Sequence, residues 1–379
     1  MRVLHIGSGG NVTGDTVHQL SRNSPGGVLF PELESLHWDL REMYISPVCF
    51  RLFLSPHLKR VTFDIPPWSD VPRRESASLV RIVSLLPTSL QQLSFTYGQV
   101  EGPLADAISS LVCRSNSSLR SFGTYTRLSG AAVRHLTQLP NLHKWVTVQG
   151  PPQTIPQSIF PSLEELHLDE QAAIPWLHLL ASHGKDTLRN SSAPTTPHAN
   201  TRETLKLLKC RNSIVDSTLL SSIIKFQNLV TLIAYTNCLG VGSCAFRLTD
   251  GDMENIATTL PRLENLQFGR PCDSSSYKTT IASLLSISTH CPGLTFLEVH
   301  FNTLSIVDDV RHLLDRDAGR DKSKCKLRYL SVGDLPFEAR GKDVEIVARW
   351  FRVVFPCLVY FLGYNVTVPW DMLRSKLGD

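Results

Sequence analysis

The stretch FPSLEELHL, residues 160–168, contains the pattern that decides the fold of this chain. A leucine is followed by two residues, a second apolar residue, one further residue and a third apolar residue. The same phrase returns as PRLENLQF at residues 261–268 and as PGLTFLEV at residues 292–299. Apolar residues at alternate positions predict a short strand that is buried on one face, with the leading leucine filling the turn before it.

Copies of this phrase occur along the whole chain. Their mean spacing is roughly 30 residues, near the upper end of the range for leucine-rich repeats. This period predicts an array of stacked units, because one unit cannot bury its apolar side alone. The leading residues of about thirteen copies are Met1, Leu33, Leu58, Leu90, Leu119, Leu142, Leu163, Leu205, Leu229, Leu263, Leu294, Leu327 and Leu358.

The segments between the phrases predict helices. Apolar residues lie three or four positions apart over 79–86, 104–112, 131–139, 217–226, 250–260 and 280–288. Thr249 or Asp250 is expected to cap the fifth of these helices, and Glu254 lies at capping-box spacing if Gly251 is the N-cap neighbour. The predicted fold is an α/β leucine-rich repeat solenoid with irregular repeats, a curved horseshoe with a parallel sheet on its concave face and helices on its convex face.

The predicted organisation is one repeat domain over residues 1–379, with about 12–13 repeats. Residues 187–204 are rich in Ser, Thr and Pro and predict a flexible polar insertion. Residues 343–379 are strongly apolar and predict a C-terminal capping region. Because Met1 already occupies a leading position and no polar cap precedes it, we expect the chain to be a fragment of a longer protein.

Composition limits the classes of function. A hydrophobic content of 42% and a charged fraction of 19% exclude general disorder, and a net charge of +4 favours neither nucleic acid nor a membrane as partner. The nine cysteines are scattered without a C-x-x-C pair, which indicates reduced, mostly buried thiols rather than disulfides or zinc ligands. With no export signal or membrane span, we expect a cytoplasmic or nuclear monomer without a cofactor or metal.

The Gly-rich stretch VLHIGSGGNVTGDTV, residues 3–17, offers a distant alternative. A glycine-rich turn after a strand is typical of nucleotide- or methyl-donor-binding enzymes, which would place a cofactor at residues 7–14. However, Val12 stands where the dinucleotide pattern requires its third glycine, and Asp15 stands where a phosphate-binding loop requires lysine. The sequence therefore favours a simple turn and a protein that is not an enzyme.

The residues between the apolar positions of each phrase are predicted to lie on the concave face. His–Asp and Glu–His pairs two residues apart suit a metal or a general base, but those at His37, His167 and His300 are several repeats apart and cannot converge. We therefore predict a polar surface for a protein partner, with Trp68 as an exposed anchor in a Pro-rich loop. The residues predicted to form this polar surface are His37, Asp39, Thr62, Asp64, Ser94, Thr96, His167, Asp169, Gln267, Glu298, His300 and Tyr329.

The phrases FPSLEELHL and CPGLTFLEV, with LTDGDMENIATTLPRLENL at residues 248–266, resemble the leucine-rich repeats of F-box proteins, in particular divergent fungal ones. The F-box itself matches no segment. The resemblance implies a substrate receptor of a ubiquitin ligase, whose repeats hold an unknown target protein. A longer form that carries an F-box would bind the adaptor of a cullin ligase. The alternative is a repeat scaffold for protein–protein interaction unrelated to ubiquitin.

Overall fold

The computed structural model describes most of the chain, in two compact units. Unit 1 comprises Met1–Leu168 and Ser182–Thr204, and unit 2 comprises Asp169–Ala181 and Leu205–Asp379. The described residues are 2–7, 14–23, 27–40, 47–65, 73–97, 101–154, 159–190, 201–211, 213–236, 246–269, 278–303, 305–316, 323–332, 341–362, 372–373 and 375–377.

The described strands form a parallel sheet of thirteen strands in chain order. Each strand begins two residues after the leading residue of a phrase, so the repeat read from the sequence is confirmed strand by strand. The strands are β1 (Val3–Ile6), β2 (Ser35–Asp39), β3 (Arg60–Ile65), β4 (Gln92–Tyr97), β5 (Ser121–Thr124), β6 (Lys144–Thr147), β7 (Glu165–Asp169), β8 (Leu207–Arg211), β9 (Thr231–Tyr235), β10 (Asn265–Gly269), β11 (Phe296–Glu298), β12 (Tyr329–Ser331) and β13 (Tyr360–Leu362).

The backbone entering each strand repeats one hydrogen-bond pattern. The N–H groups of Glu34 and Ser35 both donate to the carbonyl of Arg2, at 2.9 and 3.0 Å. The N–H groups of Lys59 and Arg60 donate in the same way to the carbonyl of Glu34, at 2.9 and 3.0 Å. This pattern holds neighbouring phrases in equal register, so residues at the same phrase position form rows across the strands.

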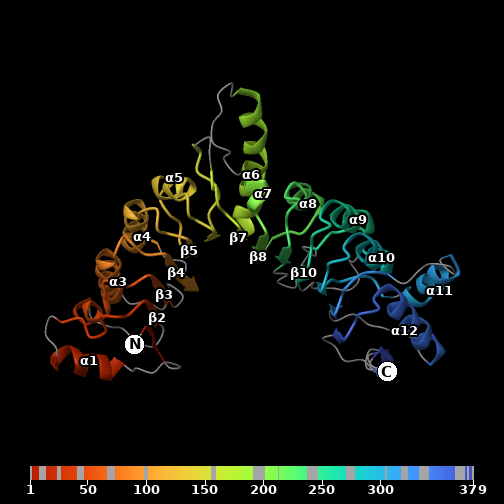
Figure 1. Ribbon diagram of the computed structural model, residues 1–379, viewed down its shortest axis with the longest axis horizontal. Helices are drawn as coiled ribbons and strands as arrows, with labels where there is room; N and C mark the ends of the chain where they lie inside the picture. The colour runs from red at the N-terminus through yellow and green to blue at the C-terminus, as the bar shows by residue number, and fades with distance from the viewer. Residues whose placement is uncertain are drawn as a thin grey trace. The chain divides into compact units, whose positions relative to one another are not determined.

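Helices return the chain between the strands and lie along one side of them in each unit (Figure 1). All six helices predicted from periodicity are present, as α3, α4, α5, α8, α9 and α10. The helical elements are α1 (Gly14–Asn23), α2 (Pro47–Phe50), η1 (Arg51–Phe53), α3 (Arg73–Leu85), α4 (Pro103–Arg114), α5 (Gly130–Gln138), α6 (Glu170–Asn190), α7 (Thr201–Thr204), α8 (Ser217–Ile223), α9 (Asp250–Thr259), α10 (Ile281–His290), α11 (Ile306–Arg316) and α12 (Lys342–Val354).

The core lies between the strands and the helices. Leading leucines such as Leu33 and Leu163 are fully buried, and so are Trp38 and Trp145 at the alternate phrase positions. Aromatic rings continue the rows through the core of unit 1, where the ring centroids of Phe63 and Phe95 lie 5.5 Å apart. The sheet and the helices thus bury the apolar positions of the phrases against their neighbours, as a solenoid requires, although Leu358 in the last phrase is only half-buried.

The predicted insertion and capping region fall partly on described elements. Residues 187–190 complete α6, residues 201–204 form α7, and residues 191–200 lie outside the described residues. In the C-terminal region the described elements are α12 and β13, and further helical residues occur at 372–373 and 375–377.

The capping box of α9 differs from the predicted one. Thr249 is the N-cap, as expected, but its partner is Asp252 rather than Glu254. The Thr249 Oγ1 accepts from the backbone N–H of Asp252 at 3.2 Å, and a carboxylate oxygen of Asp252 accepts from the N–H of Thr249 at 2.9 Å. The reason is geometric, because the box partner must lie three residues after the N-cap.

Candidate binding surface

One face of the sheet presents side chains away from the buried core. In β7 and β9 half-buried residues alternate with buried ones, which places every second side chain on the side opposite the core. We call this side the open face. Three rows of side chains cross it, at the strand positions aligned with Ser35, His37 and Asp39.

A histidine–aspartate cluster occupies the open face of β1 to β4. The rings of His5 and His37 lie 5.1 Å apart, and Nε2 of His37 lies 3.1 Å from a carboxylate oxygen of Asp64. The hydroxyl of Thr96 donates to the other carboxylate oxygen of Asp64. The sequence pattern pairs His37 with Asp39 on its own strand, whereas this contact joins it to the next strand. We call these four residues the His–Asp cluster.

In the His–Asp cluster, His37 beside Asp64 resembles a general base with an orienting carboxylate. The hydroxyl of Thr96, however, is not placed to act as a nucleophile. An activated nucleophile requires its hydroxyl within hydrogen-bond reach of the base. The hydroxyl of Thr96 instead contacts the carboxylate of Asp64 and the backbone carbonyl of Phe63, the latter at 3.2 Å. The arrangement orders donors and acceptors on a surface, which suits binding better than nucleophilic catalysis.

The first glycine of the Gly-rich stretch has a packing role. Gly7 has a φ of +149°, and a Cβ added there would lie 2.7 Å from the Cβ of Asp39 on the neighbouring strand. A side chain at this position would therefore clash with β2 and strain the backbone. This close approach accounts for Gly7 without a nucleotide, and residues 8–13 of the stretch lie outside the described residues.

A second group of interacting polar side chains lies on β8 to β10 in unit 2. Nζ of Lys209 lies 5.2 Å from the ring centroid of Tyr235, within the range of a cation–π interaction. The hydroxyl of Tyr235 donates to Oε1 of Gln267 at 2.7 Å, and the amide of Gln267 donates to Asn265 at 2.9 Å. Together, these contacts hold a cation, a phenol and two amides in a defined order across three strands.

An aromatic ladder lies on the open face of β11 to β13. Phe296, Tyr329 and Tyr360 are aligned in register on these three strands. The rings of Phe296 and Tyr329 stack at 4.5 Å with an interplanar angle of 11°, and the rings of Tyr329 and Tyr360 lie 5.9 Å apart. Of these three residues, only Tyr329 belongs to the polar surface that the sequence predicts. The signal for the others is an aromatic residue two positions after the leading leucine in consecutive phrases.

The predicted partner-facing residues differ in depth. Asp39, Asp64 and Glu298 are largely buried. Of these three, only Asp64 belongs to the His–Asp cluster. His300 is only 1% exposed, so its expected place on the partner surface is wrong, because β11 ends at Glu298 and the alternation does not continue beyond it. Trp68 lies outside the described residues. The half-buried predicted residues are His37, Thr62, Ser94, Thr96, His167, Asp169, Gln267 and Tyr329.

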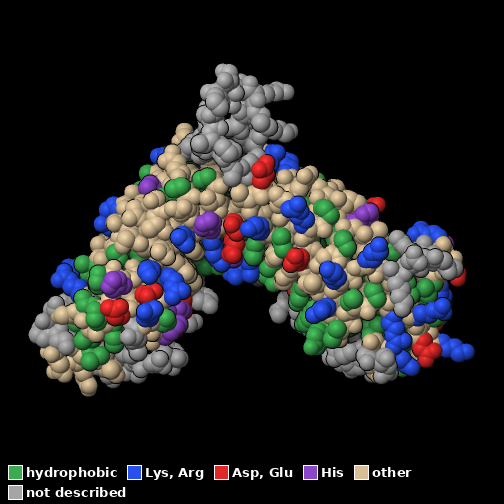
Figure 2. Space-filling model, viewed as in Figure 1, with side chains coloured by type: hydrophobic (Ala, Val, Ile, Leu, Met, Phe, Trp, Pro, Cys, Tyr) green, Lys and Arg blue, Asp and Glu red, His purple; other side chains and the backbone are tan. Residues whose placement is uncertain are grey.

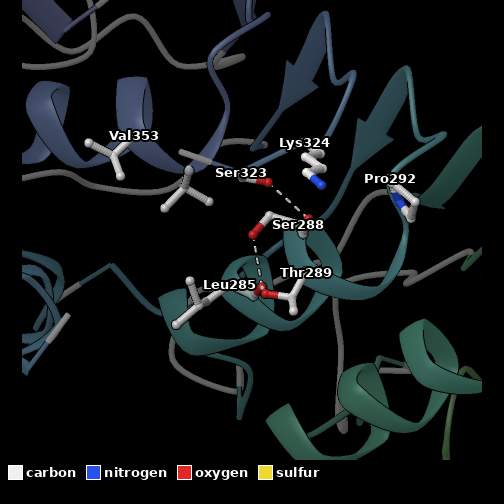
Figure 3. A pocket seen from close by; sticks show the side chains of 8 residues that line it. Leu285, Ser288, Thr289, Pro292, Ser323, Lys324 and Val353 are labelled. Atoms are coloured by element: carbon white, nitrogen blue, oxygen red, sulfur yellow. Dashed lines mark hydrogen bonds between the residues drawn. The ribbon is translucent and has the colours of Figure 1, made fainter. Parts of the chain in front are cut away.

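A hollow of about 310 Å³ lies on the helix side of unit 2, beside α10 and α12 (Figure 3). The hydroxyls of Ser288 and Ser323 are already engaged with the backbone carbonyls of Leu285 and Ser288, at 2.8 and 3.0 Å. Lys324 is the one ionisable side chain among the described lining residues. The hollow therefore offers no acid–base pair for catalysis among these residues.

Lys and Arg side chains occur on the viewed face of both units, with Asp and Glu side chains among them (Figure 2). Within the described ranges, no three His, Cys, Asp or Glu residues are placed to hold a metal ion. None of the described helices has the length and apolar character needed to cross a membrane.

The likeness of this chain to known proteins is weak in sequence and in structure. No protein-family model and no curated protein match the sequence. The structure of the Rad7 and Elc1 complex in yeast matches with 15% identity and a TM-score of 0.41, over 93% of this chain and 82% of that one. The leucine-rich repeat-containing protein LegL7 from Legionella pneumophila matches with 13% identity and a TM-score of 0.32, over 94% and 95% of the two chains.

The class of the chain therefore rests on its own strands and phrases. Thirteen phrases coincide with thirteen described parallel strands, and helices connect them. These features define an α/β leucine-rich repeat solenoid.

Proposed function

We propose that this chain is a protein-binding repeat domain and that its open face holds the partner. The observation that carries the proposal is the ordering of side chains on that face within each unit, by the His–Asp cluster in unit 1 and by the aromatic ladder in unit 2. Side chains held in place by neighbours lose little conformational freedom when a partner binds. The helices instead direct their apolar residues into the core.

We propose further that the bound partner is a substrate of a ubiquitin ligase of the F-box type. The support for this context is the resemblance of the repeat phrases to those of F-box proteins. The alternative is a scaffold unrelated to ubiquitin. Co-purification of a cullin-ligase adaptor with a longer form of the chain favours the ligase context. Partner binding by that longer form without any adaptor favours the scaffold.

A photocrosslinking experiment tests the binding face. A photoreactive amino acid is placed at Thr62 or Ile233 on the open face, and at the exposed Arg81 or Lys225 on the helix side as matched controls. We expect the same protein to be crosslinked from the open-face positions in independent preparations, with no adduct from the controls. Adducts formed only from Arg81 or Lys225 contradict the proposal.

A further inference from the structure

The open face of unit 2 carries charged side chains at one end and aromatic side chains at the other. Lys209 and Arg211 lie on β8, and Arg211 is exposed. In the row aligned with Lys209, the next residues are Ile233 and Gln267. The acidic residue of that row is Glu298, which is largely buried. Asp169, which also belongs to unit 2, is half-buried at the end of the preceding strand. The β8 end therefore carries two cations and one carboxylate, a net positive charge.

The opposite end is aromatic and accessible. Tyr360 is 60% exposed, and the adjoining Val359 is 65% exposed. Tyr360 belongs to the aromatic ladder, which continues through Tyr329 to Phe296 at the neighbouring strands. Exposed aromatic rings that are held by their neighbours are typical anchors of protein interfaces.

The distance between the two ends suits a short extended peptide. Five strand spacings separate β8 from β13 in the sheet. At about 4.8 Å per spacing, the path across them is roughly 24 Å. An extended chain advances about 3.3 Å per residue, so roughly seven residues cover this path.

We propose that the open face of unit 2 binds an extended acidic peptide segment of the partner protein. Acidic side chains at one end of the segment pair with Lys209 and Arg211. Aromatic or branched apolar side chains at the other end pack against the ladder of Phe296, Tyr329 and Tyr360. The inference rests on the proposed function and adds the chemistry and direction of the partner.

The arrangement of the rings favours a peptide over single-stranded nucleic acid. Nucleic-acid surfaces use aromatic faces on which successive bases stack. Here Phe296 and Tyr329 stack on each other at 4.5 Å, so the faces between them are already occupied. The edges of the two stacked rings pack well against aliphatic and aromatic side chains.

Selection of peptides tests the proposal directly. A random heptapeptide library displayed on phage is selected against the full chain, and the enriched peptides are measured by fluorescence polarisation. We expect acidic residues in one half of the peptides and aromatic or branched apolar residues in the other. Enriched peptides without acidic residues overturn the proposal, and so does the absence of any enrichment over an unrelated repeat protein.

Variants locate the bound peptide. Lys209→Glu with Arg211→Glu is expected to weaken binding by at least about tenfold, and Tyr360→Ser by about tenfold. A peptide whose acidic residues are replaced by lysine is expected to regain affinity for the Lys209→Glu, Arg211→Glu variant. The control pair Lys225→Glu and Arg262→Glu carries the same charge change on exposed residues of the turns between α8 and β9 and between α9 and β10, and it is expected to leave binding unchanged.

The outcomes separate this inference from the proposed function. Loss of peptide binding in His37→Gln, with Lys209→Glu and Arg211→Glu unaffected, overturns the inference and retains the open face as the binding face. Loss of peptide binding only in the control pair Lys225→Glu and Arg262→Glu overturns both the inference and the proposed function. Tighter binding of a short uridine oligomer, abolished by Lys209→Glu with Arg211→Glu, replaces the peptide with nucleic acid and overturns the inference.

Discussion

His300 lies two residues after the end of β11, with 1% of its surface exposed. Its backbone carbonyl accepts a hydrogen bond of 2.7 Å from the hydroxyl of Thr279. Burial lowers the pKa of the His300 imidazole from 6.5 to about 4, because the charged form would lose its hydration. At the scale of the residue, the structure therefore turns an expected surface group into a buried neutral one.

His300 is expected to make the folded chain sensitive to acid. In the unfolded chain the imidazole binds its proton more readily, so the contribution to the free energy of unfolding is complete above pH 6.5 and is lost as the pH falls towards 4. The loss amounts to about 3 kcal/mol. Urea unfolding across this pH range should therefore show a shallower pH dependence for His300→Gln than for the parent chain.

The exposed His57 provides the control for this measurement. His57→Gln is expected to retain the pH dependence of the parent chain. An unchanged slope in His300→Gln would show that other groups cause the acid sensitivity.

At the scale of the element, side chains at helix N-termini connect neighbouring repeats. Burial alone would raise the pKa of Asp252, but hydrogen bonds from Thr249 and Ser217 outweigh it, and the pKa is lowered. Asp250, in the first turn of the same helix, accepts from the N–H and the hydroxyl of Thr280, both at 2.7 Å. Thr280 is itself the N-cap of α10, so α9 helps to fix the start of the next helix.

Replacing Thr249 with alanine is expected to lower the free energy of unfolding by about 1 kcal/mol, because the N-terminal N–H groups of α9 lose their capping oxygen. Chemical denaturation followed by circular dichroism measures the change. Thr258→Ala is the matched control, since Thr258 lies within the same helix on an exposed position. An equal loss of stability in the two variants would contradict a specific capping contribution.

At the scale of the whole molecule, the chain is an array in which described strands pair with their neighbours in sequence order. The described residues form two compact units, and each has its own core of phrase residues. In such arrays stability is a sum of local repeat terms and nearest-neighbour interfaces. Damage to one repeat is therefore expected to spread mainly to the repeats next to it.

Phe63→Ala tests this locality in unit 1. Phe63 is buried, and its ring lies 5.5 Å from Phe95 and 6.0 Å from Phe50, so truncation removes contacts on two sides. The expected cost is about 3–5 kcal/mol. Amide hydrogen exchange should show lost protection in β2 to β4 with little change in β9 and β10.

Phe268→Ala in unit 2 is the reciprocal variant, since Phe268 is buried at the equivalent position of β10. For Phe268→Ala, amide hydrogen exchange is expected to show lost protection in β9 and β10 with little change in β2 to β4. A uniform loss over both units in either variant would contradict the nearest-neighbour description and indicate a single cooperative fold.

The sequence alone determined the repeat, the start of every described strand and the burial of Trp38 and Trp145. These features follow from local periodicity, because the alternation of apolar residues assigns each side chain to one face of its own strand. The tertiary structure decided which side chains meet across strands. His37 contacts Asp64, 27 residues away, and Phe296 stacks on Tyr329. It also decided that His300 is buried. Pairing and depth depend on the register of neighbouring repeats, which no single phrase contains.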